Sequence, residues 1–299
     1  MFLLFTPYSY IFLSFYFLVI SVIFSVSNFF LFWLFIEILI LLFIGISYTL
    51  FTHRYTQLIL YFLFQTLGSF FVLVIYIFSI KYLLFFSLFL KLGIFPFFSW
   101  YVNVLYRFPS FLLFLARTLH KLPPMYIFFL VYRIEDVRFL FIFSALTILV
   151  SSFYIFTIFD LRYLLIVSSI GNNSFILLAV MSNNLMMFAI FYRVYFLNML
   201  LLLLRFRNLT SHSYSYRIRF RVFGIYIFFL LLNLGSFPPF PGFFTKFLVF
   251  TCCYTIYRFN SHFLVIIMLV NVLIIVSYVN VFFKYILNVY SNSCYMIIF

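Results

Sequence analysis

Charged residues are scarce in this sequence: Asp, Glu, Lys and Arg make up 7% of its 299 residues, and only 4 side chains are acidic. Soluble domains carry about 25% charged and about 45–50% apolar residues. Because 68% of this chain is hydrophobic and its mean hydropathy is +1.28, the composition excludes a water-soluble globular protein. It indicates an all-α, polytopic helical membrane protein.

Cysteine is also rare, which limits the chemistry that the chain can perform. The three cysteines, Cys252, Cys253 and Cys294, do not have the spacing of a zinc or iron–sulfur site. The sequence also lacks a glycine-rich nucleotide loop, a haem ligand pair and a nucleophilic triad. We therefore expect no cofactor and no redox centre on this chain.

The apolar runs that fill the sequence are continuous, which favours helices over the strands of a β-barrel. Barrel strands read as about ten residues of alternating hydrophobicity, whereas the run Phe30–Leu50 shows no such alternation. A helix that crosses the bilayer needs about 20 apolar residues. Breaks in hydropathy predict eleven spans, near residues 8–27, 29–50, 57–80, 82–106, 110–131, 139–159, 163–181, 184–204, 222–236, 241–258 and 262–286.

These spans predict a single transmembrane domain over residues 1–299, with short loops and no soluble domain. No basic segment precedes the first apolar run, so we expect insertion through the spans themselves and no cleavable signal peptide.

Basic residues outnumber acidic ones by 18 to 4, and the formal net charge is +14. In a soluble protein this excess would suggest nucleic acid as a partner, but in a membrane protein loop cations set the orientation. Loops after even-numbered spans hold Arg54, Arg107, Arg162, Arg205, Arg207, Arg217, Arg219, Arg221 and Arg258, and the opposite loops hold Lys81, Arg133, Arg138 and Lys284. We therefore expect the N-terminus inside, the C-terminus outside, and no nucleic-acid partner.

Four charged residues lie within the apolar runs: Glu37, Lys91, Lys121 and Lys246. An ionisable group at the centre of a membrane helix costs about 2.5–3.5 kcal/mol by insertion scales, so such groups mark functional sites. Each lysine also has glycine or proline nearby, which interrupts helices and allows local hydration. Together the four residues predict a chain of protonatable groups. The alternatives are lysines that extend to the membrane surface, or a static Glu–Lys pair that only joins helices.

Three further titratable or charged residues also lie in these runs, and two of them, His120 and Arg193, have two interpretations each. Arg117 lies four residues before Lys121, on the same face of a continuous helix. His120 is either a proton relay or a packed polar side chain. Arg193, near the middle of its span, either pairs with an acid or faces another subunit, and we expect a structural role for it.

Six sequence blocks occur in a fixed order along the chain: WLFIE (Trp33–Glu37), YFLFQTLGS (Tyr61–Ser69), KLGIFPFFSW (Lys91–Trp100), LHKLPPM (Leu119–Met125), LRYLLIVSSI (Leu161–Ile170) and LGSFPPFPGFFTKF (Leu234–Phe247). Together they resemble the chain 2 family of mitochondrial NADH–ubiquinone oxidoreductase, the antiporter-like subunits in the membrane arm of respiratory complex I. The resemblance implies about 11 transmembrane helices, two of them broken, with antiporter-like helices over about 29–258 and a C-terminal helix near 262–286.

The resemblance also implies roles for the charged residues. Glu37 matches the family's intramembrane glutamate and Lys91 the lysine paired with it. Lys121 matches the central lysine, and Lys246 the lysine on the second broken helix. Altered pairing of Glu37 with Lys91 would change the proton affinity of that lysine and send a proton through Lys121 to Lys246.

As a member of this family, the chain would belong to an H⁺-translocating NADH:ubiquinone reductase. FMN, iron–sulfur clusters and ubiquinone would then lie on other subunits. The partners would be neighbouring antiporter-like chains, small hydrophobic chains and lipids. The location would be the inner mitochondrial membrane, with the N-terminus in the matrix and the C-terminus in the intermembrane space. The alternatives are a free-standing cation/proton antiporter of the same fold, and a scaffold in which the charges have no function.

Two positions depart from the family pattern. Phe98 and Asn172 stand where histidines are expected, and phenylalanine cannot carry a proton. Either water replaces these relays or the proton route differs, and His120 is placed to compensate.

Overall fold

The computed structural model describes residues 7–50, 55–78, 81–131, 137–156, 160–182, 184–206, 220–257, 265 and 267–280. These residues form helices joined by short turns, and they contain no strand. They fall into two compact units, which are described separately: residues 1–108 with 115–131, and residues 109–114 with 132–299. The prediction of a single transmembrane domain stays a prediction.

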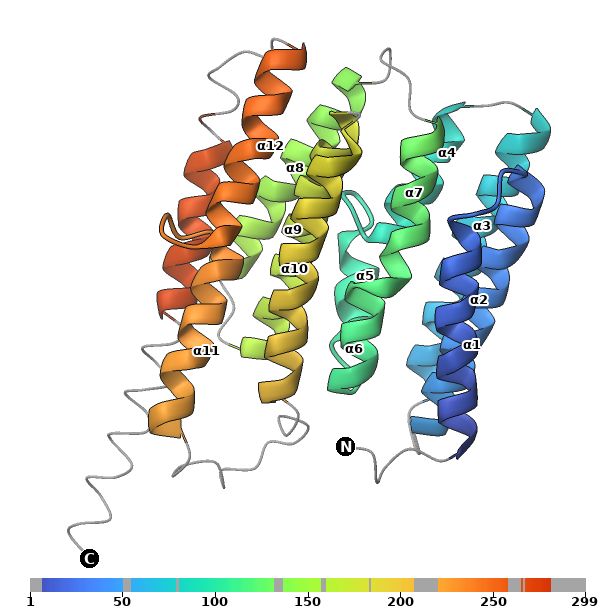
Figure 1. Cartoon of the computed structure of the whole chain (residues 1–299), viewed down its shortest axis with the longest axis horizontal. Coiled ribbons are helices and arrows are strands. Elements are labelled where there is room, and N and C mark those ends of the chain that lie inside the picture. The colour runs from blue at the N-terminus through green and yellow to red at the C-terminus, as the bar shows by residue number, and fades with distance from the viewer. Residues whose placement is uncertain are drawn as a thin grey trace, which may run out of the picture. The chain divides into compact units, whose positions relative to one another are not determined.

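The first unit contains α1 (Pro7–Ile23), α2 (Phe29–Leu50), α3 (Tyr55–Phe78), α4 (Lys81–Leu92), α5 (Phe98–Leu105), the end of α6 (Ser110–Arg117), the short 3₁₀ helix η2 (Leu119–Lys121) and α7 (Leu122–Val131). Helices α1, α2 and α3 run side by side, and α4 packs on α3 (Figure 1). Fully buried rings of Tyr16, Phe43, Tyr61 and Phe108 form the core. Aromatic rings therefore fill much of the core of this unit.

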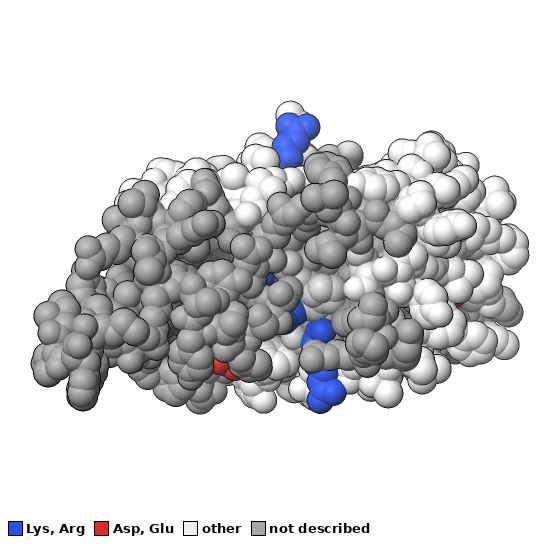
Figure 2. Space-filling model, turned by 90° about the horizontal axis from the view of Figure 1, so that it is seen from below, with Lys and Arg blue, Asp and Glu red and all other residues white. Residues whose placement is uncertain are grey.

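The second unit contains α8 (Val137–Phe156), α9 (Leu161–Met181), α10 (Leu185–Phe206), α11 (Phe220–Gly235), α12 (Pro241–Tyr257) and a last helix, Ile267–Asn280. Helix α9 is enclosed in this unit and contacts α8, α10 and α12. In the view of Figure 2, basic and acidic side chains occupy only a few places on the described surface.

Four helices of the described residues are long and apolar enough to cross a membrane: Phe29–Leu50, Thr56–Val74, Arg162–Met181 and Leu185–Leu204. Shorter apolar helices include Pro7–Ile23, Phe139–Ile155, Tyr226–Gly235 and Ile267–Asn280. These elements support the expected all-α membrane protein, although several expected spans are shorter or interrupted.

The first expected span, 8–27, is too long, because α1 ends at Ile23. Asn28 then caps α2, with its Oδ1 accepting a 3.0 Å hydrogen bond from the backbone N–H of Phe30. The expected spans 82–106 and 110–131 are each divided in two, the first between α4 and α5 and the second at Thr118.

Two of the helix ends use the same backbone geometry. Gly93 after α4 has φ of 68°, and Ser236 after α11 has φ of 67°. In each case the next N–H bonds back to the carbonyl five residues earlier, Ile94 to Phe89 and Phe237 to Leu232, both at 3.0 Å. This is the Schellman arrangement, which ends a helix and satisfies its last carbonyls. A proline follows within three residues, so neither helix continues.

Several residues behind the predicted orientation lie outside the described part of the chain, namely Arg54, Arg133, Arg207, Arg217, Arg219, Arg258 and Lys284. Cys294 also lies outside it. The orientation of the chain therefore stays a prediction.

Candidate functional site

Glu37 lies near the middle of α2 and contacts α3 through Ser69. The Ser69 hydroxyl donates a hydrogen bond to Glu37 Oε1. One helical turn before Glu37, Trp33 donates from Nε1 to the Ser69 carbonyl oxygen at 2.9 Å. Because Trp33 and Glu37 are four residues apart, they lie on the same face of α2, and both bond to Ser69 of α3. The carboxylate is thus fixed within the unit rather than left in lipid.

One face of α3 also positions Lys91. Gln65 Nε2 donates a 3.3 Å hydrogen bond to the Lys91 carbonyl oxygen, which lies at the end of α4. A Cβ placed on Gly68 would lie 2.7 Å from Lys91 Cγ, so the lysine stem packs directly on this glycine. Gln65, Gly68 and Ser69 are spaced by three or four residues and therefore share one side of the helix. Lys91 of α4 and Glu37 of α2 therefore both contact this face of α3.

The Lys91 ammonium group is buried without a hydrogen-bond partner among the described residues. Glu37 is close enough to interact with it electrostatically. A buried charge without a hydrogen bond is expensive. The described residues show no hydrogen bond between Lys91 and Glu37, and the role of this pair in proton transfer stays a prediction.

Gly68→Ala tests this packing. We expect the added methyl group to displace the Lys91 stem and to slow the proton transfer that the sequence predicts, because overpacking a filled site costs about 1–3 kcal/mol. Gly45→Ala is the matched control, since its Cβ would meet only the Phe12 ring, at 3.1 Å. The measurement is proton uptake by membrane vesicles that contain equal amounts of each variant. Equal rates for the two variants would contradict a role for the Lys91 side chain in this transfer.

The interruption after α4 places Lys121 against an aromatic ring. A Cβ on Gly93 would lie 2.6 Å from Tyr101 Cβ, so only glycine allows α5 to approach this closely. Tyr101 donates from its hydroxyl to the Ala116 carbonyl oxygen at 3.4 Å. Lys121 Nζ lies 4.8 Å from the centre of the Tyr101 ring. The ammonium group of Lys121 has no hydrogen-bond partner among the described residues, so the ring is its principal support.

The sequence suggested that Arg117 and Lys121 share a face of one continuous helix, but the structure shows that they do not. Helix α6 ends at Arg117, and Thr118, with φ of −111° and ψ of −90°, separates it from η2. Both side chains are buried and they still interact electrostatically. The expected proximity holds, but the helical spacing that predicted it does not.

His120 lies in a buried aromatic environment in the first unit. Its Nδ1 is 3.3 Å from the Tyr16 hydroxyl, and the two rings are stacked. The rings of Phe43 and Tyr61 lie 5.1 Å and 5.7 Å from the imidazole, centre to centre. Both Lys91 and Lys121 interact with it electrostatically. His120 is therefore a titratable side chain within electrostatic range of both lysines.

The second unit encloses Lys246. Its Nζ donates a 3.3 Å hydrogen bond to Asn271 Oδ1 and lies 4.5 Å from the centre of the Phe175 ring. Asn271 is itself held in its helix by a 3.1 Å bond from Nδ2 to the Ile267 carbonyl oxygen. Lys246 is thus buried with an amide and a ring, as Lys121 is buried with a ring.

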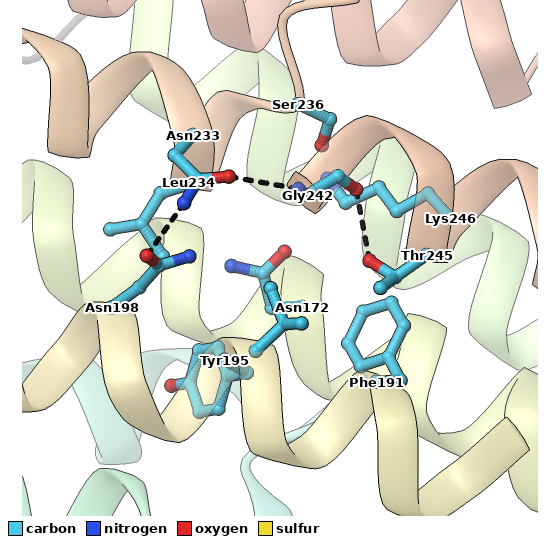
Figure 3. Close-up of a pocket in the computed structure, with 11 residues that line it drawn as sticks. Asn172, Phe191, Tyr195, Asn198, Asn233, Leu234, Ser236, Gly242, Thr245 and Lys246 are labelled. Atoms are coloured by element: carbon cyan, nitrogen blue, oxygen red, sulfur yellow. Dashed lines mark hydrogen bonds between the residues drawn. The ribbon is translucent and has the colours of Figure 1, made fainter. Parts of the chain in front are cut away.

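Polar side chains from four helices surround a small cavity beside Lys246. Asn233 Nδ2 donates to Asn198 Oδ1 at 2.6 Å, and its Oδ1 accepts from the Gly242 N–H at 2.8 Å. Figure 3 shows Asn172 between Asn198 and the Lys246 side of the cavity. The cavity volume is about 20 Å³, which is enough for one water molecule. The Ser236 hydroxyl borders it without a partner among the described residues, so it is available to such a water.

The structure brings Glu37, Lys91, His120 and Lys121 together in the first unit and places Lys246 in the second. Phe98 is buried, and Asn172 lines the cavity beside Lys246. Sequence reasoning missed a set of residues that hold these groups, namely Gln65, Gly68, Ser69, Tyr101, Asn198, Asn233 and Asn271. The signal available for the asparagines was a single amide within each apolar run.

Comparisons with known proteins point to one family. The family described as NADH:quinone oxidoreductase/Mrp antiporter, transmembrane, matches residues 40–275. A chain in the structure of respiratory complex I from Thermus thermophilus with bound aureothin is similar in fold, with a TM-score of 0.76. The two share 18% sequence identity over 93% of this chain and 70% of that chain. Among curated proteins, none matches this sequence significantly.

Proposed function

Because the chain belongs to the NADH:quinone oxidoreductase/Mrp antiporter transmembrane family, whose members are antiporter-like proton-translocating membrane subunits, we propose that it moves protons as the chain 2 subunit of NADH–ubiquinone oxidoreductase in the inner mitochondrial membrane. Quinone reduction on other subunits would drive the transfer. The six sequence blocks support the finer assignment to chain 2.

The observation that carries this proposal is the burial of three lysines in apolar helices. Lys91, Lys121 and Lys246 have 3%, 3% and 4% of their surface exposed. None of them extends to the surface, although lysines in membrane helices near an interface usually do so. A buried ammonium group that is not hydrogen-bonded to a carboxylate can release its proton, which a transfer path requires.

In the first unit, transfer begins with the Glu37–Lys91 pair. When a neighbouring charge changes, Glu37 strengthens or weakens its interaction with Lys91, while Ser69 keeps the carboxylate in place. The lysine then takes up or releases a proton. His120 passes this proton toward Lys121, because both lysines act on its ring and Tyr16 holds its Nδ1.

Water would complete the relay where this chain lacks histidine. The Tyr61 hydroxyl and Trp100 Nε1 are buried without hydrogen-bond partners in the described part of the first unit. Buried polar groups of this kind are usually satisfied by ordered water. In the second unit, a water in the cavity would join Asn172 to Lys246 and replace the missing histidine.

The proposal is tested with the purified assembly in proteoliposomes. Oxidation of NADH by a quinone is expected to acidify the vesicle lumen, as measured with a pH-sensitive dye. The chain purified alone and reconstituted in the same lipids is expected to exchange no Na⁺ or K⁺ for protons. Cation/proton exchange by the isolated chain would contradict the proposal and would favour a free-standing antiporter of the same family.

A further inference from the structure

One face of α10 is exposed along the whole length of the helix. Five of its residues, spaced by three, four or seven positions, form this exposed α10 face: Met186, Ile190, Arg193, Leu197 and Leu204. Such spacing places them on one side of an α-helix. The exposed fractions of the four apolar members range from 42% to 72%, so the described residues of the second unit leave this face uncovered.

The other side of α10 is anchored in the second unit. Phe191, Tyr195, Asn198, Met199 and Leu202 are buried there. The Phe191 ring stacks on Phe175 of α9, and Asn198 bonds to Asn233 of α11. The position of α10 is therefore set by its own unit, and its exposed side does not result from a loosely held helix.

Arg193 lies among the apolar residues of the exposed α10 face, well inside the length of the helix. It is the ninth residue of the 22-residue helix, which places it about 12 Å along the axis from the first residue at 1.5 Å per residue. The hydrocarbon layer is about 30 Å thick. An exposed guanidinium at this depth would face lipid chains, and charged groups in membrane helices almost always face protein or water instead.

Within the second unit, the described residues offer no carboxylate to Arg193. The chain has only 4 acidic residues in all. Glu37 belongs to the first unit and is bonded to Ser69, and Asp160 lies exposed at the start of α9. Glu135 and Asp136 lie outside the described residues, in a stretch expected to be a loop.

We propose that the exposed α10 face is a docking surface for a transmembrane helix of another subunit, and that this helix carries an Asp or Glu that pairs with Arg193. The inference goes beyond the proposed function, on which it depends only in that the chain works within an assembly. Arginine suits this role because its planar fork can hold both oxygens of a carboxylate.

Charge and shape favour a protein helix over a lipid headgroup. Headgroup sites use clusters of basic residues close to the membrane surface. On the exposed α10 face, Arg193 is the single charged member, and apolar residues lie one turn away on both sides. An apolar stripe with one central charge matches a second helix of the same pattern and opposite charge.

The first test is cross-linking in the native assembly. Leu197→Cys, labelled with a photoactivatable maleimide, is expected to link to an apolar peptide of another subunit that contains Asp or Glu, identified by mass spectrometry. Leu202→Cys, on the buried side, and the unsubstituted chain with its own cysteines are the controls. Adducts found only with phospholipid, or only with peptides of this chain, would overturn the proposal.

The second test is charge reversal. Arg193→Glu is expected to reduce the amount of assembled complex on native gels at least about tenfold, because a like-charge pair would replace an opposite one. Replacing the partner's acid by lysine in the same strain is expected to restore assembly. Arg107→Glu, at an exposed position two residues after α5, should have no effect. A lack of restoration would overturn the pairing between Arg193 and the partner's acid. It would not bear on the proposed function, which the lysine variants of the proton path test separately.

Discussion

Lys121→Met is expected to reduce proton translocation about 100-fold while the assembly remains intact, an effect in the range of a lost proton-transfer group. The side chain is buried, and its ammonium group is supported mainly by the Tyr101 ring. Methionine fills the same space without a titratable group. The measurements are the initial rate of proton uptake in vesicles and the amount of assembled complex on native gels.

Lys121→Arg separates proton transfer from a structural charge. Arginine keeps the positive charge and the cation–π contact, but it does not release its proton in proteins. We therefore expect nearly the same loss as with methionine. Arg107→Met, which removes an exposed charge at the end of α5, is the control and should retain full activity. Normal pumping by Lys121→Arg would mean that the lysine only supplies charge.

Glu37→Gln is expected to lower proton translocation about tenfold. The size of this loss is expected to depend on whether Lys91 is present, because the effects of mutating two interacting residues are not additive in a double-mutant cycle. Glutamine preserves the size of the side chain and can still accept the hydrogen bond from Ser69. It removes the charge that acts on Lys91. In a chain that already carries Lys91→Met, the same change should therefore have little further effect.

Glu37→Asp is the control for this cycle, because it keeps the charge and should retain part of the activity. The readout is again proton uptake at equal amounts of assembled complex. Independent, additive losses from Glu37→Gln and Lys91→Met would contradict a coupled pair. They would indicate that Glu37 and Lys91 act independently of each other.

The charged members of the candidate site could be predicted from the sequence because their transfer into lipid is so costly. Glu37 and Lys246 stand out in apolar runs for this reason. The supporting amides could not be found in the same way. Asn198 and Asn271 cost less to bury, so a single asparagine in a membrane helix gives a weak signal.

Helix boundaries were predicted well where a strong local signal exists. Prolines and glycines near residues 93–96 and 236–242 mark interruptions that the structure contains. The interruption at Thr118 has no such signal before it, and it separates Arg117 from Lys121. Spacing arguments fail at such a point, since they assume one continuous helix.

By itself, the sequence determined that this protein lies in a membrane, that its elements are helices, and that three lysines and one glutamate require an explanation. These properties follow from the free energy of transferring each residue into lipid, which is local. Only the tertiary structure decided that Gly68 receives the stem of Lys91, and that Tyr101 supports Lys121. Contacts of this kind join residues from different helices, and they depend on how whole faces fit together, which helical spacing does not specify.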